Sequence, residues 1–126
     1  MIFRALVEAT AFGTKAIHDR FVEEGVKIDE VIGIGGIALK SPFVMQVMSD
    51  VLGKPIKVCK TMQACALGAA MFAATASGVY ERVEDAIDAM NSGFSKEYIP
   101  DPARGEVYAE LYKKYTALGT FTEKCL

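Results

Sequence analysis

One short stretch constrains the fold more than any other part of the sequence: an apolar run that leads into two glycines and then into a capped helix. Val31–Ile34 is apolar and rich in β-branched residues, which predicts a strand buried on both faces. Gly35–Gly36 follows it directly. Ser41 and then Pro42 are typical of a helix N-terminus, because serine caps the first turn and proline fits the first helical position. We therefore predict a strand, a glycine turn and a helix that ends at Gly53.

The order of strand and helix then repeats once. Pro55 precedes a second predicted strand, Ile56–Cys59, and the alanine-rich run Ala64–Ala76 favours a second helix, whose small residues we expect to allow close packing. This alternation predicts parallel strands joined by right-handed crossovers, with helices over the sheet. The fold class is therefore α/β, with short parallel strands flanked by helices. Two strands would leave sheet edges unpaired, so we expect a longer protein to supply further strands.

Helices are also predicted on both sides of this unit. Bulky residues between Phe3 and Phe21 recur every three or four positions, which predicts an amphipathic helix that ends near Gly25. Residues 83–90 form a short predicted helix, and residues 107–118 form a last one whose three tyrosines pack onto the body. The segment 93–102 between them is interpreted as irregular connecting chain.

The composition narrows the possible partners. The chain has 126 residues, of which 52% are hydrophobic, enough for one compact core. A formal net charge of -2 gives no basic surface, so we predict neither nucleic acid nor membrane as a partner. Neither a spanning segment nor a signal peptide is recognisable, which predicts a cytoplasmic protein. Three cysteines and one histidine do not make a zinc site, so we predict reduced thiols and no metal ligand.

The glycine turn is the candidate binding site. Glycines can adopt positive φ and let a flat base or a ribose approach the backbone closely, and open α/β sheets usually bind ligands at the carboxyl ends of their strands. A plain tight turn would also explain the glycines. Gly33, Gly35 and Ala38 match the dinucleotide pattern G-x-G-x-x-A, but the second strand is followed by no acidic residue for a ribose. Lys60 there would tolerate a 2′-phosphate, so an NADP-type module stays open as an alternative.

Four blocks of the sequence, in this order, resemble the C-terminal domain of the FGGY carbohydrate kinases: residues 4–13, 35–41, 45–56 and 65–74. The block from Gly35 to Ser41 is similar to the turn with which that family contacts the adenosine of ATP. Three finer patterns look most like the branch of the family that phosphorylates L-ribulose: Glu-Ala-Thr-Ala-Phe-Gly, Gly-Gly-Ile-Ala-x-Lys and Leu-Tyr-x-x-Tyr. Gln63 departs from the pattern, because many members carry glutamate there.

The resemblance implies a partial actin-like ATPase (ribonuclease H-like) domain, in which residues 1–126 are the C-terminal part of a nucleotide-binding domain and the N-terminal sugar domain is absent. It implies ATP-dependent phosphorylation of L-ribulose to L-ribulose 5-phosphate in L-arabinose catabolism, with Mg²⁺ accompanying ATP. Kinases of the xylulose or glycerol type are the alternatives. The catalytic aspartate, the sugar pocket and the phosphate loops of the family have no match in this sequence. We therefore assign no catalytic or metal-binding residue and expect the isolated chain to be inactive.

The candidate cofactor-binding residues follow from the turn and the resemblance. They are Gly35, Gly36, Ile37, Ala38, Lys40 and Ser41. We expect Ser41 to act mainly as a helix cap, and Lys40 either to be solvated or to lie near the phosphates. Asp50, near the end of its helix, is most simply solvated and is not included. An exposed apolar surface would also allow two chains to pair as a homodimer.

Overall fold

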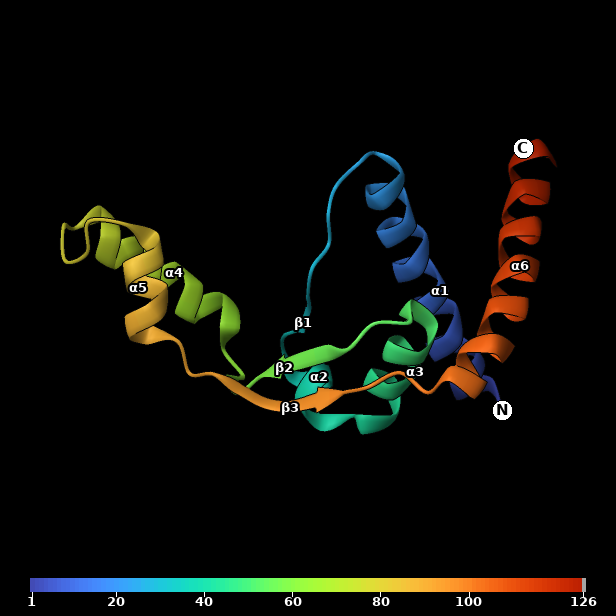
Figure 1. Ribbon diagram of the computed structural model, residues 1–126, viewed down its shortest axis with the longest axis horizontal. Coiled ribbons are helices and arrows are strands. Elements are labelled where there is room, and N and C mark those ends of the chain that lie inside the picture. Colours follow the sequence, from blue (N-terminus) through green and yellow to red (C-terminus); the bar gives the residue numbers. More distant parts are fainter. Residues whose placement is uncertain (126) are drawn as a thin grey trace.

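The computed structural model describes residues 1–125 as an elongated α/β unit, with a small sheet between two groups of helices (Figure 1). The elements in chain order are α1 (Ile2–Glu23), β1 (Val31–Gly33), α2 (Gly36–Lys40), α3 (Pro42–Leu52), β2 (Ile56–Cys59), α4 (Ala64–Ala76), α5 (Val83–Met90), β3 (Phe94–Tyr98) and α6 (Pro102–Cys125). The predicted strands and helices around the glycine turn are confirmed. None of the helices in this range has the length and apolarity that a membrane span requires.

The sheet has the order β1-β2-β3. β1 and β2 run parallel, with Val31 opposite Ile56 and Gly33 opposite Val58, as the alternation of strand and helix predicted. The prediction that β1 is buried on both faces is wrong for the described residues, because Ile32 is 48% exposed. β1 is the outermost strand on one side of the sheet. The hydrogen-bonding edge of β1 that faces away from β2 therefore has no partner strand.

The third strand corrects the sequence analysis, which interpreted residues 93–102 as irregular chain. Phe94–Tyr98 forms β3, which pairs antiparallel with β2 and makes the sheet mixed. Four of its five residues are exposed and only Tyr98 is buried, so its sequence carries no clear apolar alternation. Pairing with β2 determines this conformation, since strand formation depends more on cross-strand context than on the residues themselves.

The helix α3 holds the two halves of the core together. One buried cluster joins α3 to α1 and α6 and consists of Val7, Ala11, Phe12, Val47, Val51 and Tyr108. The other joins α3 to α2 and the sheet and consists of Ala38, Met45, Leu52, Ile56, Val58 and Tyr98. Among the described helices α3 has the most buried residues, and the glycine turn is joined to it through the short helix α2.

The tyrosines of α6 pack on α1 as the sequence predicted. The ring of Phe12 lies 6.3 Å from that of Tyr108, 5.9 Å from Tyr112 and 5.6 Å from Tyr115, measured between ring centroids. The pair with Tyr108 meets edge to face, one of the favoured arrangements of aromatic rings. Phe12 therefore packs against all three of these tyrosines and is a central contact between α1 and α6.

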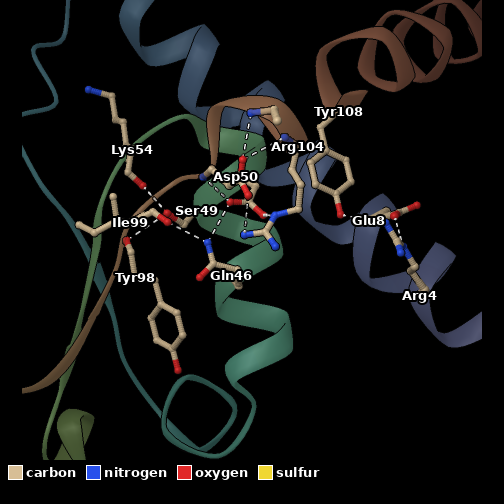
Figure 2. Close-up of polar contacts among 12 residues, drawn as sticks. Arg4, Glu8, Gln46, Ser49, Asp50, Lys54, Tyr98, Ile99, Arg104 and Tyr108 are labelled. Atoms are coloured by element: carbon tan, nitrogen blue, oxygen red, sulfur yellow. Dashed lines mark hydrogen bonds and ion pairs between the residues drawn. The ribbon is translucent and has the colours of Figure 1, made fainter. Parts of the chain in front are cut away.

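The surroundings of Asp50 correct a second prediction. Its side chain is 1% exposed rather than solvated, and both oxygens are used (Figure 2). Oδ1 accepts from the Gln46 amide at 2.9 Å and from the backbone N–H of Asp101 at 2.8 Å, and Oδ2 lies 2.8 Å from Nε of Arg104. The neighbouring Ser49 hydroxyl donates to the last carbonyl of β3. These contacts fasten the connection between β3 and α6 onto α3.

Candidate functional site

The glycine turn lies at the carboxyl end of β1, on the same edge of the sheet as the end of the parallel strand β2. Gly35 has φ 87° and ψ 179°, a conformation that is essentially restricted to glycine because a side chain would clash with the backbone. The chain then enters α2 at Gly36, so the predicted turn contains a short additional helix before α3. Backbone geometry alone therefore explains the glycine at position 35.

Gly33 and Gly36 have opposite surroundings. A Cβ built on Gly33 would lie 2.8 Å from Cε of Met45 and 3.4 Å from Cβ of Ala38. A Cβ built on Gly36 would meet no atom within 4 Å, and the φ of Gly36 is not positive. Close packing explains Gly33, whereas neither packing nor backbone strain explains Gly36. The bare backbone at Gly36 faces open space, which suits close approach by a flat ligand.

The two apolar candidates next to the glycines lie in different surroundings. Ile37 is 69% exposed, so its side chain is free to contact a ligand. Ala38 is 5% exposed and belongs to the buried cluster on the sheet, so it supports the turn from below. Both also line, with Ile34, a shallow apolar cavity of about 210 Å³ between the turn, α1 and α3. Apolar walls of this kind suit a nucleotide base.

The cavity includes residues that the sequence analysis did not select. Ile34 could have been chosen, because it stands between the predicted strand and the glycines. Thr14 lies on α1 and reaches the cavity only through the packing of that helix on α3. No local sequence pattern identifies a residue that, like Thr14, joins a cavity through the packing of two helices.

The two polar candidates take separate roles. Ser41 ends α2 and caps α3, and its Oγ accepts from the backbone N–H of Val44 at 3.4 Å, so its predicted capping role is confirmed. Lys40 is the last residue of α2 and is exposed. Because none of the six candidate residues is acidic, Lys40 gives this surface a positive charge, which suits a phosphate-bearing ligand.

The geometry thus brings Gly35, Gly36, Ile37 and Lys40 to one open surface, with Ala38 and Ser41 supporting it. Over residues 1–125 there is no group of three or more metal-ligating side chains. The surface can bind and orient a ligand through main-chain approach, apolar contact and one cation. It offers no side chain placed to act as a base on that ligand.

Comparison with known proteins supplies the family. A family model described as the C-terminal domain of the FGGY family of carbohydrate kinases matches residues 1–77. The chain belongs to this family. The match covers α1, the glycine turn, α3 and α4, whereas α5, β3 and α6 lie beyond it.

Similar proteins extend over almost the whole chain. A ribulokinase from Vibrio parahaemolyticus is 49% identical over 98% of this chain, and a ribulokinase from Bacillus licheniformis is 44% identical over 98%. These alignments cover 22% and 23% of the two relatives, so the chain spans less than a quarter of their length. Three short patterns predicted a similarity to the branch of the family that phosphorylates L-ribulose. The ribulokinase relatives confirm this similarity.

Solved structures confirm the fold class. The xylulose kinase from Rhodospirillum rubrum matches with a TM-score of 0.80 and 28% identity, over 98% of this chain and 25% of that protein. The structural neighbours are FGGY sugar kinases, which have the actin-like ATPase fold. The mixed α/β unit described above is therefore a part of that fold.

Proposed function

We propose that this chain supplies the adenosine-binding side of the ATP site in a kinase that converts L-ribulose to L-ribulose 5-phosphate. Residues 1–126 are then the C-terminal part of the nucleotide-binding domain of a cytoplasmic enzyme of L-arabinose catabolism. The choice of sugar rests on the ribulokinase relatives at 49% and 44% identity. The xylulose kinase of known structure, at 28% identity, makes D-xylulose the second candidate substrate.

Gly36 is the observation that carries the nucleotide role. It has neither the positive φ nor the close neighbour that otherwise accounts for a glycine, and it stands where a parallel strand ends. Ligands of open α/β sheets bind at this end of the strands. A base or ribose lying against the bare main chain gives the missing reason for this glycine.

Each candidate residue then has a defined task. The main chain of Gly35 and Gly36 lies against the adenosine, and Ile37 covers an apolar face of the base and excludes water from it. Lys40 directs its ammonium group toward the phosphates. ATP, as its Mg²⁺ complex, supplies the phosphoryl group. The proposal assigns no catalytic and no metal-binding residue to this chain.

Family membership favours this proposal over the NADP-type module. The chain belongs to a carbohydrate kinase family, and Lys60 after β2 bonds through its backbone N–H to the carbonyl of Gly93. The missing carboxylate after β2 counts against an NAD site but not against an NADP site, so family membership is the argument that favours the kinase. Calorimetry with NADPH and with ATP on this chain separates the two functions, because tighter binding of NADPH would overturn the kinase proposal.

The kinase role of this chain is tested in a complete enzyme. This chain replaces the aligned stretch of the V. parahaemolyticus ribulokinase, and ADP release by the chimera is measured with L-ribulose, D-xylulose and glycerol. We expect release with L-ribulose, because the ribulokinase part supplies the sugar pocket and this chain supplies the adenosine side of the ATP site. A soluble, folded chimera with no ADP release from any sugar would overturn the kinase role of this chain.

A further inference from the structure

The central part of the chain is rich in lysine and poor in acidic residues. Between positions 31 and 80 the charged residues are Lys40, Asp50, Lys54, Lys57 and Lys60. The one carboxylate among them, that of Asp50, is buried and paired with Arg104. Since these positions include β1, the glycine turn and β2, the charge that they contribute at the surface is positive.

The four lysines differ in whether they have a partner. The ammonium group of Lys54 donates to a backbone carbonyl at 3.1 Å, and that of Lys57 pairs with the carboxylate of Glu30. Lys40 and Lys60 are exposed, and neither forms an ion pair within residues 1–125. Lys40 follows the turn after β1 and Lys60 follows β2, so both unpaired cations come after the carboxyl end of a parallel strand.

The register of the two parallel strands places Lys60 beside the glycine turn. Gly33 is opposite Val58, and Gly35 and Lys60 stand two residues further along their chains. Neighbouring strands lie about 4.8 Å apart, so the main chain of Lys60 passes close to the turn. The backbone N–H of Lys60 donates to the carbonyl of Gly93 at 3.0 Å, which holds this main chain in place.

The side chain of Lys60 belongs to the face of the sheet on which α2 packs. Val58 is buried in the same cluster as Ala38 of α2, whereas Cys59 lines the groove on the side of α4. Because side chains of a strand alternate between the two faces, Lys60 follows Val58 rather than Cys59. Lys40 is the last residue of α2, so the two unpaired lysines approach the turn from the same face.

We propose that Lys60 is a positioning residue for the phosphates of the bound nucleotide and acts together with Lys40. This role rests on the proposed function, which assigns the adenosine to the main chain of Gly35 and Gly36. The phosphates of ATP carry more negative charge than one ammonium group neutralises, and lysine brings a point charge on a flexible stem. Since neither lysine has a carboxylate partner among the described residues, no ion pair has to break before both contact the phosphates. The ligand class is therefore a nucleoside polyphosphate, bound more tightly than the nucleoside alone.

The test is nucleotide binding to the chimera of this chain with the V. parahaemolyticus ribulokinase. The Kd for ATP is measured by calorimetry, and the Kd for adenosine by its competition with ATP. Lys60→Met removes the charge and keeps an apolar stem. We expect the Kd for ATP to rise at least about fivefold and the Kd for adenosine to stay within about twofold. The rise should become smaller at high KCl concentration, because salt screens exposed charges.

Lys57→Met is the matched control. It removes the same charge from the same part of the chain, but at a lysine that is already paired with Glu30. We expect it to change the Kd for ATP by no more than about twofold. The role of Lys60 is overturned if Lys60→Met binds ATP like the wild type, or if Lys57→Met weakens ATP binding equally. Equal weakening of ATP and adenosine by Lys60→Met also overturns it, because Lys60 would then support the turn rather than the phosphates.

The same measurements separate the role of Lys60 from the proposed function. ATP binding that Lys60→Met leaves unchanged removes Lys60 from the site and leaves the adenosine-binding role of the turn standing. A folded wild-type chimera that binds no ATP overturns both.

Discussion

Removal of the Asp50 carboxylate is predicted to destabilise the chain strongly, although Asp50 lies outside the candidate site. In Asp50→Ala the backbone N–H of Asp101 loses its acceptor, and an unpaired buried donor of this kind costs about 1–3 kcal/mol. Arg104 is 51% exposed, so water replaces much of its ion pair, which contributes at most about 1 kcal/mol. Gln46 keeps its second acceptor, the carbonyl of Ile99 at 2.8 Å. We therefore expect the free energy of unfolding to fall by about 3 kcal/mol.

The measurement is urea unfolding followed by circular dichroism, with the slope of the transition compared between variants. Asp50→Asn keeps the shape and one acceptor oxygen, so we expect it to cost about 1–2 kcal/mol. Arg104→Ala is expected to cost about 1 kcal/mol or less, because its partner charge keeps two other donors. The reasoning is refuted if Asp50→Ala stays within about 0.5 kcal/mol of the wild type, or if Arg104→Ala costs as much as Asp50→Ala.

Three further predictions follow from packing, backbone geometry and titration. Phe12 is 6% exposed, so Phe12→Ala should lower the free energy of unfolding in urea by about 3–5 kcal/mol. Phe72 is 66% exposed, so Phe72→Ala should change it by no more than about 0.5 kcal/mol. Equal losses in the two variants would contradict the core assignment. Gly35→Ala should cost about 1–3 kcal/mol and Gly36→Ala nothing, since only Gly35 has a positive φ; the reverse order would refute the turn geometry. Burial, and then the charge of Asp19, raise the pKa of Tyr112 above 10, so the neutral phenol is favoured in the folded chain and stability should fall as pH rises above 10. Tyr112→Phe should weaken that fall in unfolding at pH 9 and 11, and an unchanged pH dependence would contradict the assignment.

Local sequence signals were sufficient for the elements around the glycine turn. Ser41 and Pro42 predict the start of α3 because capping and the fixed φ of proline act within one turn. The ends of α1 and α4 also follow from local signals, because Gly25 and Gly78 take the positive φ that is typical just after a helix. β3 could not be predicted this way, because its mostly exposed residues become a strand only through pairing with β2.

The candidate site shows the same division between local and distant contacts. Sequence located the glycines but could not separate Gly33 from Gly36, because the difference depends on Met45 and on how α3 packs under β1. Asp50 was assigned to solvent because the backbone N–H that it accepts from lies 51 residues further along the chain. Both outcomes follow from long-range packing, which no spacing within a single helix or strand encodes.

The most direct test of the nucleotide role is the KM for ATP of the active chimera carrying Gly36→Val. A side chain at Gly36 meets no atom of this chain, so folding should be unaffected, but it occupies the space assigned to the adenosine. Gly119→Val, at a second glycine with open surroundings, is the control. We predict that Gly36→Val raises the KM for ATP at least about tenfold, with the KM for L-ribulose unchanged and Gly119→Val without effect. An unchanged KM for ATP in the Gly36→Val chimera would contradict the adenosine-binding role of the turn.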